Sequence, residues 1–163
     1  MQKYTSADTS INVVNKIYSK YKFNPNTVVL DYGGGKFDTN QRFMKWKGVD
    51  VYVYDKFNRT DAHNKNVRKY MKRRPPDYVV CSNVLNVIYE DEIIDQILQD
   101  IAKYDKATVL FSFYEGDGSG VGKETSKGWQ RNKKSKEYLP VINKYFDVIS
   151  KRNNIYECVR KSA

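Results

Sequence analysis

The sequence is poor in the residues that build metal centres and disulfide frameworks. It has one histidine and two cysteines in 163 residues. Cys81 and Cys158 each stand inside an apolar run, with no partner at metal-ligand spacing. This pattern excludes zinc-finger and disulfide-scaffold classes, so we predict no metal site and two buried thiols in a reducing compartment.

Long apolar runs are also missing. No stretch approaches the length of a membrane span, and the polar start "MQKYTSADTS" lacks the charged-then-apolar layout of a signal peptide. We therefore expect a cytoplasmic protein, in the host cytoplasm if it is viral, with no membrane partner. The length suits one domain over 1–163 and leaves no room for separate cofactor and substrate domains.

Acidic residues are outnumbered by basic ones. Lys and Arg total 29 against 19 Asp and Glu, which gives a net charge of +10 and a sequence pI near 9.4. Such an excess favours an anionic partner, for example nucleic acid. Solubility alone would explain the same charge, and composition does not decide between the two.

Strand-like and helix-like patterns alternate along the chain. Apolar, β-rich runs occupy 27–31, 49–55, 76–83 and 107–114. Helical patterns are expected at 6–20, 38–48, 66–73, 90–104 and 135–146, and loop composition follows 55. Asn153-Asn154 separates two final strand-like runs, as in a hairpin turn. This order predicts an open, mainly parallel α/β sheet with an antiparallel C-terminal hairpin.

The loop after the first strand is the best candidate for a ligand site. Open α/β sheets bind ligands beyond the carboxyl ends of their strands, and this loop reads "DYGGGKF" over 31–37. Asp55 ends the next strand, 55 − 35 = 20 positions after Gly35, where an acid accepts hydrogen bonds from ribose hydroxyls. The pair predicts a nucleoside-containing cofactor rather than a tight turn and a solvated aspartate. Asp38 stands where a dinucleotide fingerprint has Gly or Ala, which disfavours a dinucleotide.

Three segments together resemble the motifs of class I S-adenosylmethionine-dependent methyltransferases: "VVLDYGGGKF", "VYVYD" and "DYVVCSNVLNVI". Asp31, Gly33 and Gly35 match the family's acid-x-Gly-x-Gly signature, and Phe37 stands where its last glycine is usual. The resemblance implies a Rossmann-like three-layer α/β/α sandwich and S-adenosylmethionine as cofactor. It also implies that Asp31 and the glycine backbone hold the methionine part while Asp55 binds the ribose. The cofactor residues expected on this basis are Asp31, Tyr32, Gly33, Gly34, Gly35, Asp55, Lys56, Ser82 and Asn83.

A narrower likeness is to putative methyltransferases associated with DNA phosphorothioation. It rests on "DYGGG", "NVLNVI" and the later Gly128-Trp129-Gln130-Arg131. It bears on the cofactor domain and gives no substrate.

In the family, residues leaving the strand at 76–83 face the transferable methyl group, which here singles out Ser82, Asn83 and Asn86. "SNVL" lacks the Pro-Pro-aromatic of enzymes that methylate exocyclic amino groups, and Cys81 lacks the proline that precedes a cytosine-C5 nucleophile. Methyl transfer is an in-line displacement, so alignment alone supplies much of the acceleration. A hydroxyl acceptor would also need a base. Our predicted catalytic set is Asn83, Glu115 and Asp117, with His63 read as an exposed loop histidine without a role.

The glycine- and lysine-rich segment 115–134 follows the fourth strand, at the same edge as the glycine loop. We predict that it forms a lid or substrate wall. Its candidate substrate residues are Lys123, Trp129, Arg131, Lys133 and Lys134, which combine positive charge with an aromatic ring. The alternative is a mobile, solvated loop with Trp129 folded back on the core.

The leading functional hypothesis is a methyltransferase acting on an anionic acceptor, with nucleic acid favoured. Two alternatives stay open: an enzyme that cleaves S-adenosylmethionine, as some small viral proteins do, and a non-catalytic binding module. A composition rich in Lys, Asn, Tyr and Ile suits a phage or a low-GC bacterium. A protein partner for target recognition is also expected, because no recognition domain is appended.

Overall fold

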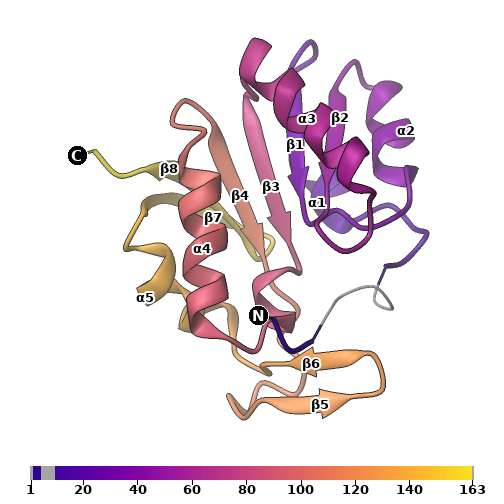
Figure 1. The fold of residues 1–163 in the computed structure, drawn as a ribbon. Helices are drawn as coiled ribbons and strands as arrows, with labels where there is room; N and C mark the ends of the chain where they lie inside the picture. The colour runs from indigo at the N-terminus through magenta and orange to yellow at the C-terminus, as the bar shows by residue number, and fades with distance from the viewer. Residues whose placement is uncertain (1, 5–9, 163) are drawn as a thin grey trace.

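The computed structural model describes residues 2–4 and 10–162. It is built on a six-stranded sheet of order β2-β1-β3-β4-β8-β7 (Figure 1). The strands are β1 (Val28–Tyr32), β2 (Asp50–Tyr54), β3 (Tyr78–Ser82), β4 (Thr108–Ser112), β7 (Phe146–Arg152) and β8 (Ile155–Arg160). The first four run parallel, and β8 is antiparallel to both of its neighbours. The predicted mainly parallel sheet with an antiparallel C-terminal hairpin is confirmed.

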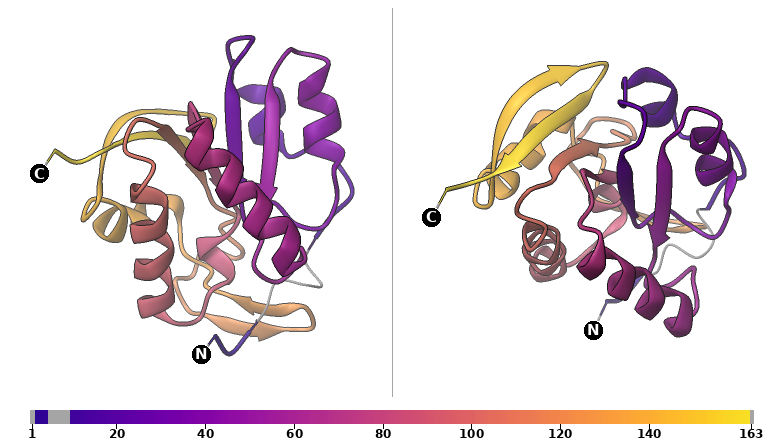
Figure 2. Two further views of the ribbon diagram at one scale, coloured as in Figure 1. Left: turned by 45° about the horizontal axis from the view of Figure 1, so that its top comes forward. Right: turned by 90° about the horizontal axis from the view of Figure 1, so that it is seen from above.

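Helices cover both faces of the sheet. The evidence is β1, in which every residue is buried although alternate side chains point to opposite sides. Val29 belongs to the core shared with α1 (Lys16–Lys20) and α2 (Thr39–Lys45). Leu30 belongs to the core shared with α3 (Asp61–Arg73) and α4 (Asp91–Ala102). Also on this second face are η3 (Ser135–Tyr138) and α5 (Leu139–Ile142). The result is the expected three-layer α/β/α sandwich (Figure 2).

Asparagine forms the turn of the final hairpin. Asn153 and Asn154 have φ angles of +53° and +59°. Two successive left-handed residues match the twist of the flanking strands, and asparagine tolerates this conformation better than most residues. The predicted Asn-Asn hairpin turn is confirmed.

The N-terminal helix expected over 6–20 is much shorter in the structure. Residues 5–9 lie outside the described part of the chain, 10–15 are not helical, and α1 begins at Lys16. Asn15 caps this helix by accepting a hydrogen bond from Ile17 N, and it also donates from Nδ2 to Ser82 Oγ at 3.0 Å. Its side chain is therefore bonded both to the helix end and to the sheet edge, which fixes where the helix can start.

Two other helices also differ from the prediction. The helix expected at 66–73 begins earlier, at Asp61, where the Thr60 hydroxyl caps His63 N. His63 is thus a half-buried helix residue rather than an exposed loop residue, with Nε2 2.7 Å from Val53 O. The helix expected at 135–146 is divided into η3 and α5, with Pro140 in the first turn of α5, where a missing N–H costs little.

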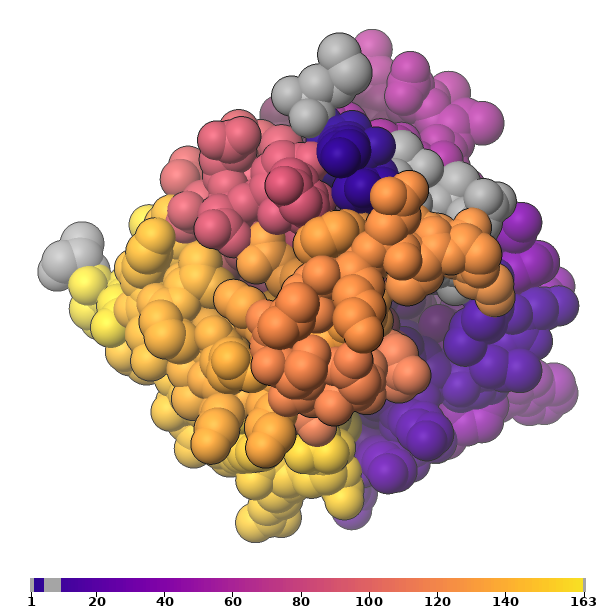
Figure 3. Space-filling model, turned by 90° about the horizontal axis from the view of Figure 1, so that it is seen from below, coloured from indigo at the N-terminus to yellow at the C-terminus, as the bar shows by residue number. Residues whose placement is uncertain are grey.

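Segment 115–134 contains a short hairpin, β5 (Lys123–Thr125) and β6 (Gly128–Gln130). It lies across the carboxyl-terminal edge of the sheet, beside the N-terminal residues (Figure 3). No helix in the described part of the chain is long and apolar enough to cross a membrane.

Candidate active site

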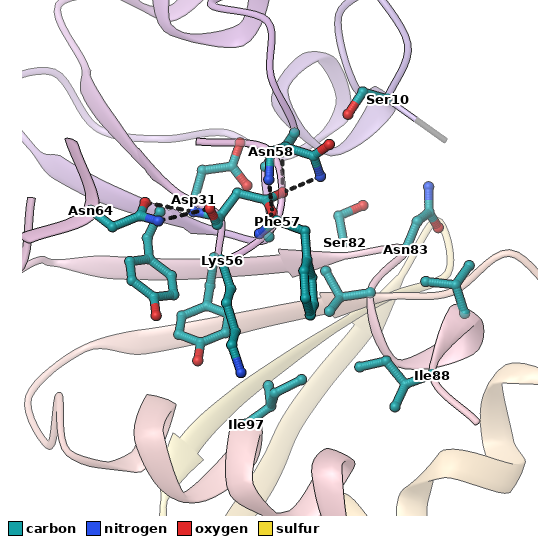
Figure 4. A pocket seen from close by; sticks show the side chains of 18 of the residues that line it. Ser10, Asp31, Lys56, Phe57, Asn58, Asn64, Ser82, Asn83, Ile88 and Ile97 are labelled. Atoms are coloured by element: carbon teal, nitrogen blue, oxygen red, sulfur yellow. Dashed lines mark hydrogen bonds between the residues drawn. The ribbon is translucent and has the colours of Figure 1, made fainter. Parts of the chain in front are cut away.

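A cavity of about 940 Å³ opens at the carboxyl ends of β1, β2 and β3 and extends between α3 and α4. The glycine loop, the β2–α3 connection, the 3-10 helix η2 (Leu85–Val87) with its flanking residues, and α4 supply its walls (Figure 4). This is the sheet edge at which parallel α/β folds bind ligands, and the edge that the sequence predicted.

The glycine loop is shaped by its neighbours. Gly33 and Gly35 have φ angles of +78° and +85°, which disfavour other residues. Gly33 N donates to Tyr54 O at 2.7 Å, so the loop is tied to the end of β2. A Cβ at Gly34 would stand 2.6 Å from the Asp31 carboxyl group. Only glycine at position 34 lets the chain pass this close to Asp31.

Asp31 is a buried carboxylic acid at the end of β1, with 3% of its surface exposed. Its burial, assisted by the nearby charge of Asp55, raises the pKa of Asp31 to about 7. The Tyr18 hydroxyl, and to a smaller degree the positive charge of Arg59 and the Asn40 side chain, oppose this rise in pKa and do not cancel it. At neutral pH the side chain therefore stands near the midpoint of its titration, and a cation placed over the glycine loop would favour its ionised form.

Asp55 organises the base of the cavity and is 4% exposed. Its Oδ2 accepts hydrogen bonds from Gly35 N at 2.8 Å and Asn58 Nδ2 at 3.0 Å. Its Oδ1 accepts from Phe57 N at 3.1 Å and Asn58 N at 3.0 Å. Asn64 brackets the backbone of Asp55 with two further bonds. One carboxylate thus joins the glycine loop to the β2–α3 connection. Of its four donors, only the Asn58 amide is on a rotatable side chain.

An aromatic ring and aliphatic side chains line the space below these carboxylates. Phe57 projects from the end of β2 into the cavity, above Ile97 and toward Ile88 (Figure 4). A ring facing aliphatic side chains forms an apolar slot suited to a purine base. Sequence reasoning missed Phe57, although an apolar residue two positions after Asp55 in a polar loop was a usable signal.

The end of β3 contributes polar groups. Ser82 Oγ lies 2.5 Å from Ser112 Oγ and accepts from Asn15 Nδ2. Asn83 has φ +58°, its backbone N donates to Ser112 O at 2.9 Å, and the residue lines the cavity. With these two, the structure brings together in one cavity wall all nine residues expected to hold the cofactor, namely Asp31, Tyr32, Gly33, Gly34, Gly35, Asp55, Lys56, Ser82 and Asn83.

The remaining predicted catalytic residues do not reach this cavity. Glu115 accepts a hydrogen bond from Ser135 N. Asp117 accepts from Ser119 N and lies 3.7 Å from Lys123 Nζ; these hydrogen bonds and the lysine charge hold the pKa of Asp117 below its usual value. Both carboxylates form bonds within the 115–134 segment or to η3, so they stabilise the conformation of this loop. Neither lies at the cavity, where a general base would have to be.

The predicted substrate residues also lie outside the cavity walls, and two are held by the protein itself. Trp129 stacks on Tyr4 at a centroid distance of 5.6 Å and meets Tyr89 edge-on at 4.7 Å. Arg131 is 9% exposed, and its guanidinium donates to Ile88 O, Tyr89 O and Asp91 Oδ1 at 2.6 to 2.9 Å. Lys123, Lys133 and Lys134 complete this set outside the cavity.

Replacing Arg131 with alanine should therefore act on stability. The variant leaves two inward-facing carbonyls without their donor, so we expect the free energy of unfolding to fall by about 2–4 kcal/mol. The Asp91 ion pair adds little, because the Asp91 side chain is 89% exposed. Urea denaturation measures the change, and Lys127→Ala in the exposed hairpin turn is the control, expected within about 0.5 kcal/mol of the parent. Equal stability of the two variants would contradict the proposed contribution of Arg131 to stability.

Comparison with known proteins adds evidence on the fold. The sequence matches no protein-family model and no curated protein. The structure is similar to the crystal structure of a SAM dependent methyltransferase from Aquifex aeolicus, with a TM-score of 0.56, 12% sequence identity and 88% of each chain covered. The fold is Rossmann-like and similar to that of this methyltransferase. At this identity the likeness speaks for the architecture alone, and function has to be argued from the residues of the cavity.

Within the described residues, no group of three or more His, Cys, Asp or Glu side chains is arranged to hold a metal ion. Burial raises the pKa of the Cys81 thiol far above its usual value, and Cys158 is buried as well. Both thiols are free and belong to the core, as the sequence predicted.

Proposed function

We propose that the protein is an S-adenosylmethionine-dependent methyltransferase acting on an anionic acceptor, with nucleic acid favoured. The observation that carries the proposal is the buried carboxylate of Asp55, bonded to Gly35 N beside the apolar slot under Phe57. A carboxylate at the end of the second strand, next to a glycine loop, is the arrangement that binds a ribose diol in this class of fold.

The cavity offers groups that would meet the ribose, the adenine and the ammonium group of the cofactor. Asp55 would accept hydrogen bonds from the ribose hydroxyls, which requires the Asn58 amide to rotate away from Oδ2. Phe57 and the isoleucines of α4 would hold the adenine ring. Asp31, beneath Gly34, would attract the methionine ammonium group. When bound, S-adenosylmethionine supplies an electrophilic methyl group on a sulfonium.

The residues at the end of β3 would position the acceptor. Ser82 and Asn83 offer hydrogen-bonding groups and carry no ionisable base. Because Glu115 and Asp117 bond elsewhere, we expect catalysis to rest on alignment of acceptor and methyl group in a partly enclosed cavity rather than on proton abstraction by a side chain.

Cofactor binding is tested most directly by thermal unfolding with S-adenosylhomocysteine. A ligand that binds only the native state stabilises it by about 2.7 kcal/mol at 100 times its Kd, so the melting temperature should rise by several degrees. Adenosine alone should give a smaller rise, because it lacks the group that would meet Asp31. No shift at saturating S-adenosylhomocysteine would rule the proposal out.

A second assay separates transfer from cleavage. Mass analysis of S-adenosylmethionine incubated with the protein alone should find the cofactor intact. Loss of cofactor without an acceptor would identify a cleaving enzyme. Such an enzyme would give the same thermal shift with S-adenosylhomocysteine, so only the mass analysis separates the two activities.

A further inference from the structure

One wall of the cavity carries a row of positive charge that the cofactor does not need. Four of the five Lys and Arg residues of α3 line the cavity: Lys65, Arg68, Lys69 and Lys72. A solvated helix would direct such residues away from a concave surface, whereas here only Arg73 is outside the lining. The spacing of i, i+4 and i+7 places the three lysines on one side of the helix.

These lysines are not neutralised by the protein. Arg68 is held by Asp100, with N–O distances of 3.1 and 2.8 Å, and its guanidinium lies 4.2 Å from the centre of the Tyr54 ring. For Lys65, Lys69 and Lys72, no ion pair to a carboxylate exists within residues 2–4 and 10–162. Three ammonium groups thus line the cavity without an ion-pair partner.

The opposite wall does not supply one either. Ile93, Gln96 and Ile97 of α4 face the cavity and are uncharged. Of the four acids of α4, Asp91 bonds to Arg131, Asp95 to Tyr145 and Lys144, and Asp100 to Arg68 and Tyr32, while Glu92 lies outside the lining of this cavity. The groove between α3 and α4 therefore has lysines along one side, with the exposed Asp61 at the start of α3, and uncharged residues along the other.

The proposed cofactor cannot account for this charge. S-adenosylmethionine has a sulfonium and an ammonium against one carboxylate, so a row of lysines along its binding cavity would repel it. The row is suited to a molecule with several negative charges. Four residues of helix span about 6 Å and seven about 10 Å, so the ammonium groups can contact more than one phosphate of an extended chain.

We propose that the groove between α3 and α4 binds the phosphate backbone of a single-stranded nucleic acid, which is the acceptor or carries it. This deepens the proposed function and rests on it only for the chemistry done on the bound strand. Figure 1 shows α3 running away from the carboxyl-terminal edge of the sheet, so the row from Lys65 to Lys72 leads away from the cofactor end of the cavity. Because the proposed cofactor would occupy part of this cavity of about 940 Å³, we expect the groove to take one strand rather than a duplex.

The anion-binding surface that we infer therefore lies on α3, whereas the sequence had suggested the 115–134 segment. Among the residues that the sequence suggested, Lys123 is paired with Asp117, and Arg131 is used to hold the hairpin to the loop before α4. The two surfaces are separated by sequence and by position, which allows a direct comparison of two triple variants with the same change in charge.

The test uses fluorescein-labelled single-stranded oligonucleotides of mixed sequence, with anisotropy measured over a range of salt concentrations. One variant carries Lys65→Gln, Lys69→Gln and Lys72→Gln; the matched control carries Lys123→Gln, Lys133→Gln and Lys134→Gln. We expect the α3 variant to bind about tenfold or more weakly at low salt, and the slope of log K against log salt to fall by about 2, since each lost single-strand phosphate contact removes about 0.7. The hairpin control should keep both values near those of the parent.

Two further measurements keep the result interpretable. Thermal unfolding establishes that both triple variants fold, and S-adenosylhomocysteine titration reports the cofactor site independently. An α3 variant that binds oligonucleotide as the parent does, or a hairpin control that loses as much, would overturn the inference. Tighter binding of a duplex of the same sequence would overturn it as well. If oligonucleotide binding depends on α3 while S-adenosylhomocysteine fails to bind the parent, the proposed function is wrong and the groove assignment stands.

Discussion

Replacing Asp55 with alanine is expected to weaken S-adenosylhomocysteine binding by about 100- to 10,000-fold. Two charge-assisted hydrogen bonds to ribose hydroxyls are each worth about 1.5–3 kcal/mol, and every 1.4 kcal/mol is a factor of ten in Kd. The same substitution releases Gly35 N, so the glycine loop loses one of its links to the end of β2 and keeps the bond from Gly33 N to Tyr54 O. Isothermal titration calorimetry measures the change in Kd.

Asp61→Ala is the matched control for this variant. Asp61 lines the same cavity from the first turn of α3, and its side chain is exposed. Its loss should change S-adenosylhomocysteine affinity by less than about threefold. Because the Asp55 variant leaves three backbone N–H groups without their acceptor, its stability should fall by about 1–3 kcal/mol, so urea denaturation has to establish that it is folded. A folded Asp55 variant with parental affinity would refute the ribose assignment.

The position of this site followed from the sequence because it depends on a topological rule. Parallel strands end at one edge of the sheet, so the loop at Gly33 and the acid at Asp55 had to meet once both strands were placed correctly. The hydrogen bond from Gly35 N to Asp55 realises that expectation.

The tertiary contacts of the 115–134 segment could not be predicted from the sequence. Its glycines and lysines indicate a mobile loop, yet Arg131 bonds to carbonyls that precede α4 and Trp129 stacks on Tyr4 from the N-terminal segment. These partners are distant in sequence, and no local pattern reports them. Tertiary contacts hold Trp129 and Arg131 outside the walls of the cavity, and the contact of the five candidate residues with a substrate stays a prediction.

The start of α3 was missed for a different reason. The polar stretch before residue 66 has loop composition, and the cap formed by Thr60 ahead of Asp61 is a short signal within it. Once the helix begins at Asp61, its lysines acquire a periodicity that a loop would lack. The inference about the groove therefore depends on the start of α3 at Asp61, which the composition of this stretch did not predict.

Asp31 leads to a prediction about pH. The folded-state pKa of Asp31 is raised to about 7 by burial, while the unfolded chain has the ordinary value of 3.8. Between these two values the folded state binds the proton and the unfolded state does not, so the free energy of unfolding falls as pH rises. We expect Asp31 to cost the protein roughly 2–3 kcal/mol of stability between pH 5 and pH 8.

An asparagine side chain has the same shape as aspartate without the titration, so the Asp31→Asn variant isolates this effect from every other ionisable group. The difference in unfolding free energy between variant and parent should grow in favour of the variant from pH 5 to pH 8, as measured by urea denaturation at each pH. A difference that stays constant with pH would show that Asp31 titrates near its ordinary pKa in the folded protein.

The same titration should appear in cofactor binding. A methionine ammonium group above Gly34 favours the ionised carboxylate, so binding below pH 7 has to expel the proton from Asp31. In the parent, S-adenosylhomocysteine affinity should rise as pH increases toward 7 and level off above it, and calorimetry in buffers of different ionisation enthalpy should detect the released proton. The Asp31→Asn variant should bind more weakly at pH 8 and lose this component of the pH dependence. Ionisation of the buried Asp31 carboxyl group therefore has opposite effects on two measured quantities. It lowers the free energy of unfolding of the protein without ligand, and it raises the affinity for a ligand that places a cation above Gly34.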